Sequence, residues 1–234
     1  MNRLSHSAGE VISYIEMCQA WSASLQRGMN FRLRPECSVI LMSRRSNAPY
    51  RDRVEEDGRV LIYEGHDVPR SSRFPNPKTV DQPRATPAGK LTQNGMFAEA
   101  ARKAKERLCP PEVVAVYEKI HPGIWAFNGF FLLTDAWVEM AAQRKVFKFR
   151  LELAEAKESL VAQPEELLHN RLIPSAVKLE VWTRDKGRCV LCGSDKNLHF
   201  DHDLPFSKGG TSLTAENIKL LCAKHNLSKG AKIQ

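Results

Sequence analysis

The sequence predicts an α+β protein with two domains. Between residues 35 and 153, short apolar runs alternate with charged or proline-rich segments, which is typical of a β-rich domain with a few helices. Near the C-terminus, cysteine and histidine residues have the spacing of small metal-stabilised folds. The length of 234 residues is sufficient for two domains that each bury a core. We therefore expect a first domain over 1–154, a linker over 155–170 and a second domain over 171–234.

The first elements of the first domain follow from hydrophobic spacing. Residues 7–24 mix apolar and polar positions at helical spacing and predict a helix that packs on the domain that follows. Apolar runs at 38–42 and 59–63 predict two strands, and the charged segment between them ends in an Asp-Gly turn dipeptide. Five prolines and several basic residues between 69 and 89 predict a long functional loop.

A helix and three strands are expected in the rest of this domain. Alanine, lysine, glutamate and arginine dominate residues 92–108, as they do in helices. Strand-like runs follow at 113–120, 127–133 and 145–153, and the last alternates apolar and charged residues as a strand with one buried face does. Residues 155–170 are polar and acidic and predict a helical linker. The sequence contains no internal repeat.

The charge balance indicates a polyanionic partner. The formal net charge is +8 and the sequence pI is near 9.3, and nucleic acid is the commonest soluble polyanion. Residues 171–234 contain 11 lysines and arginines against 6 acidic residues, whereas the remainder contains 24 against 21. The second domain is therefore the more basic per residue. Since there is no run of about 18 apolar residues and no secretory signal at the N-terminus, we expect no membrane contact and a cytoplasmic location.

The second domain contains two pairs of potential metal ligands. Cys189 and Cys192 form a C-x-x-C pair, and Cys222 and His225 form a C-x-x-H pair. Two such pairs can hold one tetrahedral zinc ion and give a small loop-rich unit its core. The remaining cysteines lie among apolar residues, and in a reducing compartment we expect small buried thiols. They are Cys18, Cys37 and Cys109.

A second set of polar residues lies between and beside the zinc pairs. It consists of the adjacent Asp201 and His202, together with Asn217 and Asn226. Carboxylate and amide oxygens bind hard divalent ions, and a neutral imidazole can accept a proton from water. Phosphodiester hydrolysis needs these groups. The alternatives are a structural histidine and helix-capping roles for the oxygen ligands.

Residues 35–153 resemble the SRA (YDG) domain, which binds modified cytosine in duplex DNA. The matching segments occur in the family's order: Ser38-Val-Ile-Leu, Tyr50-Arg-Asp52, Glu56-Asp57-Gly58, Tyr63-Glu-Gly65, Asp81-Gln82, Gly89 to Gly95, Asn128-Gly129-Phe-Phe, Trp137 and Val146 to Arg150. The resemblance implies a curved, PUA-like β-barrel with flanking helices that flips the target base into a pocket. It implies that Tyr50 and Tyr63 sandwich the base and that Asp52 accepts a hydrogen bond from cytosine N4.

Two positions depart from the SRA pattern. Asn128 stands where the YDG motif has aspartate, and Glu64 follows Tyr63 where a small hydroxyl residue is common. The identity of the modification, 5-methyl or 5-hydroxymethyl, therefore stays open. Basic residues of the proline-rich loop are expected to contact DNA phosphates or a groove, with an ordinary flexible basic loop as the alternative. They are Arg70, Arg73, Lys78 and Arg84.

Residues 175–229 resemble the HNH, or ββα-metal, nuclease family. The C-x-x-C, Asp-His-x-x-Pro, Gly-Gly and Asn-x-x-x-x-Cys elements occur in the family's order. The resemblance implies His202 as general base, Asn217 as the residue that orients it, and Asp201 and Asn226 as ligands of Mg²⁺ or Mn²⁺. It assigns His225 to structural zinc with the three cysteines, and the alternative exchanges the roles of His225 and Asn226. Lys208 and Lys229 are candidates for phosphate contact.

Together the two resemblances imply a modification-dependent restriction endonuclease of the McrA type. It would bind double-stranded DNA carrying modified cytosine and cut nearby, leaving 5′-phosphate and 3′-hydroxyl ends. One HNH centre cuts one strand, so a double-strand break needs two centres and we expect a homodimer. Two alternatives stay open: a nuclease specific for another DNA modification, and a catalytically silent reader.

Overall fold

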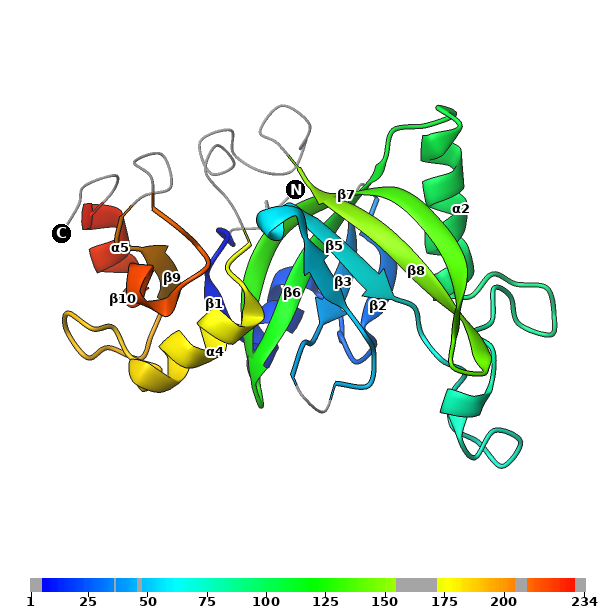
Figure 1. Ribbon diagram of the computed structural model, residues 1–234, viewed down its shortest axis with the longest axis horizontal. Helices are drawn as coiled ribbons and strands as arrows, with labels where there is room; N and C mark the ends of the chain where they lie inside the picture. The colour runs from blue at the N-terminus through cyan, green and yellow to red at the C-terminus, as the bar shows by residue number, and fades with distance from the viewer. Residues whose placement is uncertain (1–5, 36, 46–47, 155–171, 205–209, 230–234) are drawn as a thin grey trace.

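The computed structural model describes residues 6–35, 37–45, 48–154, 172–204 and 210–229. It confirms the α+β class, with a large curved sheet flanked by helices and a small two-stranded sheet in the C-terminal part (Figure 1). The predicted linker at 155–170 lies outside the described residues.

The described residues up to 154 form eight strands and two α-helices. The strands are β1 (Val11–Ser13), β2 (Met29–Arg34), β3 (Cys37–Met42), β4 (Arg53–Glu55), β5 (Val60–Glu64), β6 (Glu112–His121), β7 (Ile124–Ala141) and β8 (Arg144–Leu153). The helices are α1 (Tyr14–Trp21) and α2 (Gln93–Lys105), with short 3-10 turns at Glu56–Gly58 and Pro77–Thr79. The C-terminal part contains α4 (Ser175–Arg184), β9 (Leu198–His202), a 3-10 turn at Ala215–Asn217, β10 (Ile218–Cys222) and α5 (Ala223–Lys229).

The large sheet has the strand order β2-β3-β6-β7-β8-β5-β4, and β1 pairs with the start of β7. Neighbours are antiparallel except for β3 and β6, which are parallel. The 18-residue β7 pairs with β6 along its first part and with β8 along the rest, so it spans the curved sheet (Figure 1). Among the described residues the edge strands β2 and β4 are not paired with each other. The expected barrel is therefore a strongly curved open sheet.

A hydrophobic core lies on each face of this sheet. Successive side chains of a strand point to opposite faces, and Ile40 and Val39 of β3 accordingly belong to different cores. Ile40 packs in the core that α2 covers through Phe97, whereas Val39 packs with Met17 of α1. Helices α2 and α1 thus each cover one face of the sheet.

The predicted helix over 7–24 is too long at its N-terminal end. Residues 11–13 form β1 instead, because they pair with β7 from Ile124 to Ala126. Helix α1 begins after Ser13, whose side chain accepts a hydrogen bond from the Glu16 amide while the Glu16 carboxylate accepts one from the Ser13 amide. This capping box fixes the helix start.

The C-terminal part packs directly on the large sheet. The Gly9 amide donates to the Phe127 carbonyl at 2.8 Å, and the Gly9 carbonyl accepts from the Phe200 amide at 2.9 Å, so the segment before β1 joins β7 to β9. Gly9 has φ +85°, and a Cβ there would lie 2.8 Å from the Phe200 carbonyl oxygen. Ile120 and Ala126 of the sheet share one buried core with the C-terminal elements.

Candidate functional sites

The four residues of the predicted zinc set lie together. All of their potential ligand atoms are within 4.8 Å of one another. His225 Nδ1 lies 3.4 Å from Cys189 Sγ and 3.3 Å from Cys222 Sγ, and Cys192 Sγ lies 3.8 Å from Cys222 Sγ. Thiolates bound tetrahedrally at about 2.3 Å from zinc would be about 3.8 Å apart. The residues therefore fit a tetrahedral zinc ion.

A tight turn, the end of a strand and a helix position these four ligands. Cys189 and Cys192 lie in a tight turn that the Gly193 amide closes by donating to the Cys189 carbonyl at 2.8 Å, while Cys222 ends β10 and His225 lies on α5. Burial raises the pKa of the Cys189 thiol. Hydrogen bonds that the amides of Cys222 and Leu191 donate to its sulfur have the opposite effect, and the net result is a pKa lowered to about 6. A thiol that ionises near neutral pH is a suitable metal ligand.

Asp201, His202 and Asn226 line one small cavity of about 110 Å³. Asp201 and His202 end β9, and Asn226 lies on the facing helix α5. Strand β9 and helix α5 thus bring together the carboxylate, imidazole and amide that the sequence separates by up to 25 positions. The structure places His225 with the thiols and Asn226 at the cavity.

The His202 ring is oriented by Ser212. Its Nε2 atom lies 2.8 Å from the Ser212 hydroxyl oxygen, a contact that the sequence did not reveal. Burial lowers the pKa of His202; Asp201 opposes this effect and Lys229 adds to it. The imidazole is therefore neutral near pH 7, and when Nε2 donates to Ser212, Nδ1 is the nitrogen that can accept a proton.

Asn217 closes the loop that follows His202. Its side-chain oxygen accepts from the Leu204 amide at 2.7 Å, and its nitrogen donates to the carbonyls of Leu204 at 3.0 Å and Thr211 at 2.8 Å. A Cβ at Gly210 would lie 1.8 Å from the Leu204 carbonyl oxygen, so this close approach requires glycine. Asn217 thus holds the two ends of the 204–211 segment together.

Lys229 is buried against Asp201. Its ammonium group lies 2.6 Å from Asp201 Oδ2 and also donates to the His202 carbonyl, and only 2% of its side chain is exposed. Lys229 therefore contacts Asp201, which is the candidate metal ligand. The other predicted phosphate contact of this part, Lys208, lies outside the described residues.

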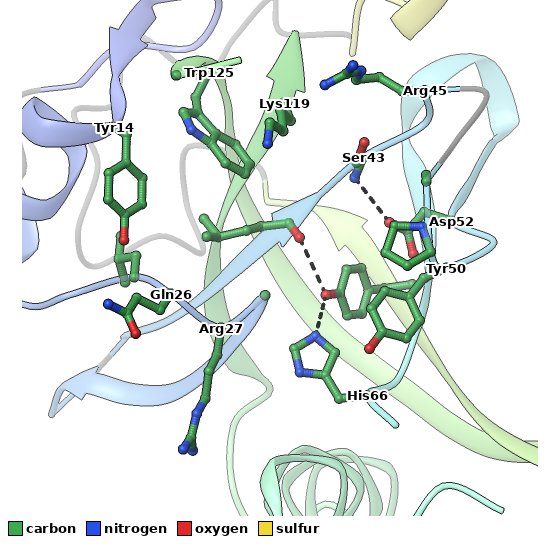
Figure 2. A pocket seen from close by; sticks show the side chains of 17 residues that line it. Tyr14, Gln26, Arg27, Ser43, Arg45, Tyr50, Asp52, His66, Lys119 and Trp125 are labelled. Carbon is green, nitrogen blue, oxygen red and sulfur yellow. Dashed lines mark hydrogen bonds between the residues drawn. The ribbon is translucent and has the colours of Figure 1, made fainter. Parts of the chain in front are cut away.

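A large pocket in the first domain gathers the three residues predicted to hold a base. Tyr50, Asp52 and Tyr63 line a pocket of about 920 Å³ (Figure 2). Tyr63 is fully buried on β5, and its hydroxyl donates to the Leu41 carbonyl at 3.4 Å. Tyr50 is partly exposed.

Asp52 is held by two backbone amides. One carboxylate oxygen accepts from the Ser43 amide at 3.3 Å (Figure 2). The other accepts from the Glu64 amide at 3.0 Å. Burial raises the pKa of Asp52 to about 7 despite these hydrogen bonds. Each carboxylate oxygen has a further lone pair, so the group can accept another hydrogen bond from a ligand.

His66 is a pocket residue that sequence reasoning missed. Its ring stacks on Tyr50 with centroids 5.2 Å apart and 16° between the planes, and its Nε2 atom lies 3.1 Å from the Tyr63 hydroxyl. Burial lowers the pKa of His66 to about 4, so the imidazole is neutral at pH 7. His66 thus links the two tyrosines that were expected to hold the base.

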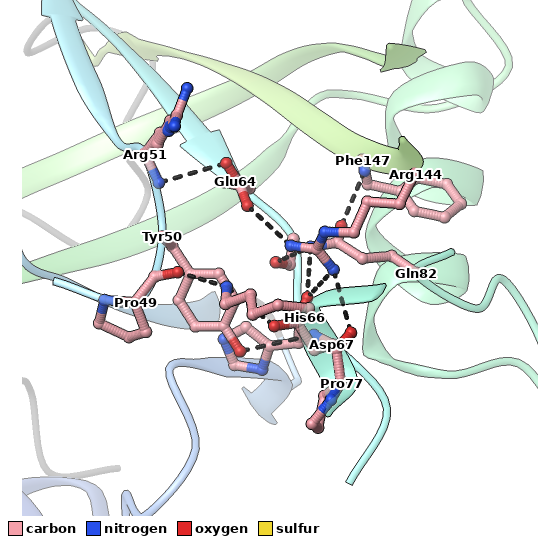
Figure 3. Close-up of polar contacts among 12 residues, drawn as sticks. Pro49, Tyr50, Arg51, Glu64, His66, Asp67, Pro77, Gln82, Arg144 and Phe147 are labelled. Carbon is pink, nitrogen blue, oxygen red and sulfur yellow. Dashed lines mark hydrogen bonds and ion pairs between the residues drawn. The ribbon is translucent and has the colours of Figure 1, made fainter. Parts of the chain in front are cut away.

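A buried network of charges supports the segment from Tyr63 to Asp67. Arg144 of β8 contacts Asp67 at 2.5 Å and Glu64 at 3.4 Å (Figure 3). Lys148 contacts Glu64 at 2.9 Å. Hydrogen bonds from Lys78, Arg144 and Gln82 lower the pKa of Asp67, although burial raises it. Such pairing compensates for the cost of burying charge and fixes this side of the pocket.

The basic residues of the proline-rich loop occupy different environments. Lys78 lies at the pocket edge, 4.1 Å from the centroid of the Tyr50 ring and 2.9 Å from Asp67. Arg84 pairs with Glu99 at 3.0 Å, whereas Arg70 and Arg73 are exposed. Three further basic side chains line the pocket itself and had no distinguishing sequence pattern. They are Arg27, Arg45 and Lys119.

A buried polar cluster joins the two parts of the chain beside the Asp201 cavity. Lys178 of α4 donates to Glu118 at 2.7 Å and to the Asn128 side-chain oxygen at 2.5 Å, and Asn128 donates to Glu118 at 3.1 Å. Burial raises the pKa of Glu118, but Lys178 lowers it below its usual range. Asn128, which departs from the YDG motif, thus contacts the C-terminal part.

No protein-family model and no curated protein matches this chain. Among solved structures, the SUVH5 SRA domain in complex with hemimethylated CG DNA is similar at a TM-score of 0.45 and 22% identity, covering 64% of this chain and 90% of that chain. KRYPTONITE in complex with mCHH DNA, an H3(1-15) peptide and SAH gives 0.41 and 14%, covering 67% and 33%. The Type IV phosphorothioation-dependent restriction endonuclease ScoMcrA gives 0.41 and 15%, covering 95% and 55%.

Among the described residues, no helix is long and apolar enough to cross a membrane.

Proposed function

We propose that this protein is a modification-dependent DNA endonuclease. Its first domain reads 5-methylcytosine or 5-hydroxymethylcytosine flipped out of duplex DNA, and its C-terminal part hydrolyses a phosphodiester bond nearby. The observation that carries the proposal is that Asp201, His202 and Asn226 meet at one cavity beside a Cys₃His site. The net charge of +8 supports DNA as the partner.

Base reading follows from the aromatic pocket. Flipping a base costs a few kcal/mol, and stacking on an aromatic ring returns about 1–3 kcal/mol per base. Tyr50 offers the ring, and the ionised Asp52 carboxylate accepts a hydrogen bond from the cytosine N4 amine. Because backbone amides fix both oxygens of Asp52, the acceptor is oriented before the base arrives.

Strand cleavage follows from the cavity residues. The Nδ1 atom of His202 takes a proton from the attacking water, and Ser212 keeps the imidazole in place. Asp201 and Asn226 supply hard oxygen ligands, so a Mg²⁺ or Mn²⁺ ion bound there would stabilise the charge on phosphorus and on the departing 3′-oxygen. The products carry 5′-phosphate and 3′-hydroxyl ends. Two protomers on one DNA would cut both strands.

Cleavage of matched duplexes tests this proposal. Identical duplexes carry unmodified, 5-methyl or 5-hydroxymethyl cytosine at one position, and we expect cutting with Mg²⁺ or Mn²⁺ of one or both modified duplexes only. His202→Ala should abolish cutting while zinc content and DNA binding persist. His121→Ala, which replaces an exposed histidine outside both sites, is the matched control and should cut normally. Equal cutting of all three duplexes would remove the reader function.

A second candidate is a catalytically silent reader whose C-terminal part only clamps DNA. The contact between Lys229 and Asp201 favours it, because the carboxylate is already neutralised. The same experiment separates the two functions. A silent reader binds modified duplexes but produces no nicks with either metal, in the wild type as in His202→Ala.

A further inference from the structure

The ammonium group of Lys229 lies where a cation is expected to bind Asp201. It lies 2.6 Å from Asp201 Oδ2 and donates to the His202 carbonyl, so two oxygen atoms contact the positive charge. The Lys229 side chain is 2% exposed, whereas that of Asp201 is 25% exposed. A buried ammonium is stable only when it is paired, and Asp201 is the carboxylate that pairs with it.

An ammonium and a divalent cation compete at this position. Both would bind the Asp201 carboxylate, and two like charges a few ångströms apart repel each other. Asn226 precedes Lys229 by three residues on α5, so the amide and the ammonium lie on the same side of the helix. A divalent cation held by Asp201 and Asn226 would therefore repel the Lys229 ammonium from its place.

We propose that Lys229 is a built-in counter-ion that a divalent cation must displace from Asp201, so that metal binding and release of the Lys229 side chain are coupled. The inference rests on the proposed nuclease site and adds a positioning residue to it. In the metal-free protein the ammonium keeps Asp201 paired and oriented. Once released, it stays on α5 beside the cavity, where a DNA phosphate can pair with it.

A neighbouring lysine provides a matched comparison. Lys219 of β10 lies opposite Asp201 in the strand register, but its ammonium pairs with Asp203 at 2.8 Å and its side chain is 37% exposed. Lys219→Met therefore removes a positive charge from the strand that pairs with Asp201 without freeing the Asp201 carboxylate. Lys229→Arg keeps the charge at the site itself.

Binding of Mn²⁺ to zinc-loaded protein, measured by electron paramagnetic resonance, tests the competition. We expect Lys229→Met to bind Mn²⁺ about tenfold more tightly than the wild type, since one competing charge is gone. Lys229→Arg and Lys219→Met should stay within about twofold of the wild type. Asp201→Asn in the Lys229→Met background should remove the gain. Zinc content and melting temperature show that each variant is folded.

Chemical labelling tests the release in the unaltered protein. An amine-reactive reagent followed by mass spectrometry should modify Lys229 slowly without divalent cation and several-fold faster with Mn²⁺. Exposed Lys224 on the same helix should label equally in both conditions. This measurement decides the inference even where Lys229→Met does not fold.

The outcomes separate this inference from the proposed function. If Mn²⁺ binds at a site that Asp201→Asn removes, but Lys229→Met binds no more tightly and Lys229 labelling does not change, the counter-ion role is overturned and the nuclease site stands. If no Asp201-dependent Mn²⁺ binding occurs in the wild type or in Lys229→Met, the nuclease site fails, and the counter-ion role fails with it.

Discussion

The imidazole of His66 stacks on the ring of Tyr50, with 5.2 Å between the ring centroids and 16° between the ring planes. The same imidazole lies 3.1 Å from the Tyr63 hydroxyl. In the free protein a neutral flat ring therefore already covers one face of Tyr50 in the pocket. The Lys78 ammonium lies 4.1 Å from the centroid of the same ring, so a flipped base that stacks on Tyr50 would replace one of these two neighbours.

Tyr50→Ala is expected to weaken binding to a modified duplex about tenfold or more, because stacking on one ring contributes about 1–3 kcal/mol. Tyr50→Phe should bind nearly as the wild type does, since the ring remains. Fluorescence anisotropy with matched modified and unmodified duplexes measures both. Equal loss of affinity for the two duplexes in Tyr50→Ala would show that Tyr50 does not contact the base.

The pKa of about 7 at Asp52 predicts that base reading depends on pH. Only the ionised carboxylate accepts from cytosine N4, so affinity for the modified duplex should fall by up to about tenfold between pH 8 and pH 6. Asp52→Asn keeps an acceptor oxygen that does not titrate, and its binding should be independent of pH over this range. Affinity is measured without divalent cation. A wild type whose binding does not vary with pH would contradict this role.

The same pKa has a consequence for stability. Because the folded protein retains a proton on Asp52 that the unfolded chain loses near pH 4, the Asp52 contribution to the free energy of unfolding decreases as the pH rises from about 4 to 7. Asp52→Asn should therefore gain stability relative to the wild type as the pH rises over this range. Urea unfolding at several pH values measures the difference, and a constant difference would contradict the raised pKa.

The Cys₃His set predicts one structural zinc ion per chain. Cys222→Ser should lose zinc and the fold of the C-terminal part, because structural zinc contributes about 10 kcal/mol to the folding of small domains. Cys109→Ser, outside the set, should keep both. Elemental analysis and thermal unfolding provide the measurements. Full zinc content in Cys222→Ser would refute the assignment.

The buried pair of Glu118 and Lys178 predicts an asymmetric mutational effect. Lys178→Met leaves an unpaired buried carboxylate and should lower the free energy of unfolding by about 3–5 kcal/mol. Adding Glu118→Gln should recover part of this loss, because no buried charge then remains. Lys224→Met, which replaces an exposed lysine on α5, is the control. A double variant less stable than Lys178→Met would contradict the proposed cause.

Local patterns predicted much of the fold. The apolar runs that became β3, β5, β6 and β8 and the alanine-rich segment that became α2 were all recognisable from the sequence. Strand β2 was missed although Met29, Phe31 and Leu33 alternate with polar residues, because so short a charged segment also fits a loop. The second half of β7 was missed because pairing with β8, and not its own composition, keeps it extended.

The candidate sites show the same division between local and distant signals. The zinc set and the Asp201 and His202 pair were predictable because ligand spacing is encoded within a few residues. The contact of Lys178 with Glu118 joins positions 60 residues apart, and that of His202 with Ser212 depends on a loop closed by Asn217. Such contacts arise only from tertiary packing, which spacing in the sequence does not reveal.

Cleavage of a duplex with a single 5-methyl or 5-hydroxymethyl cytosine tests most directly that one chain both reads and cuts DNA. With Mn²⁺, we expect the wild type to nick near the modified base and to leave the unmodified duplex intact. Tyr50→Ala should lose this preference, and His202→Ala should bind without nicking. Nicking of modified and unmodified duplexes at equal rates, or nicking that persists in His202→Ala, would contradict this function.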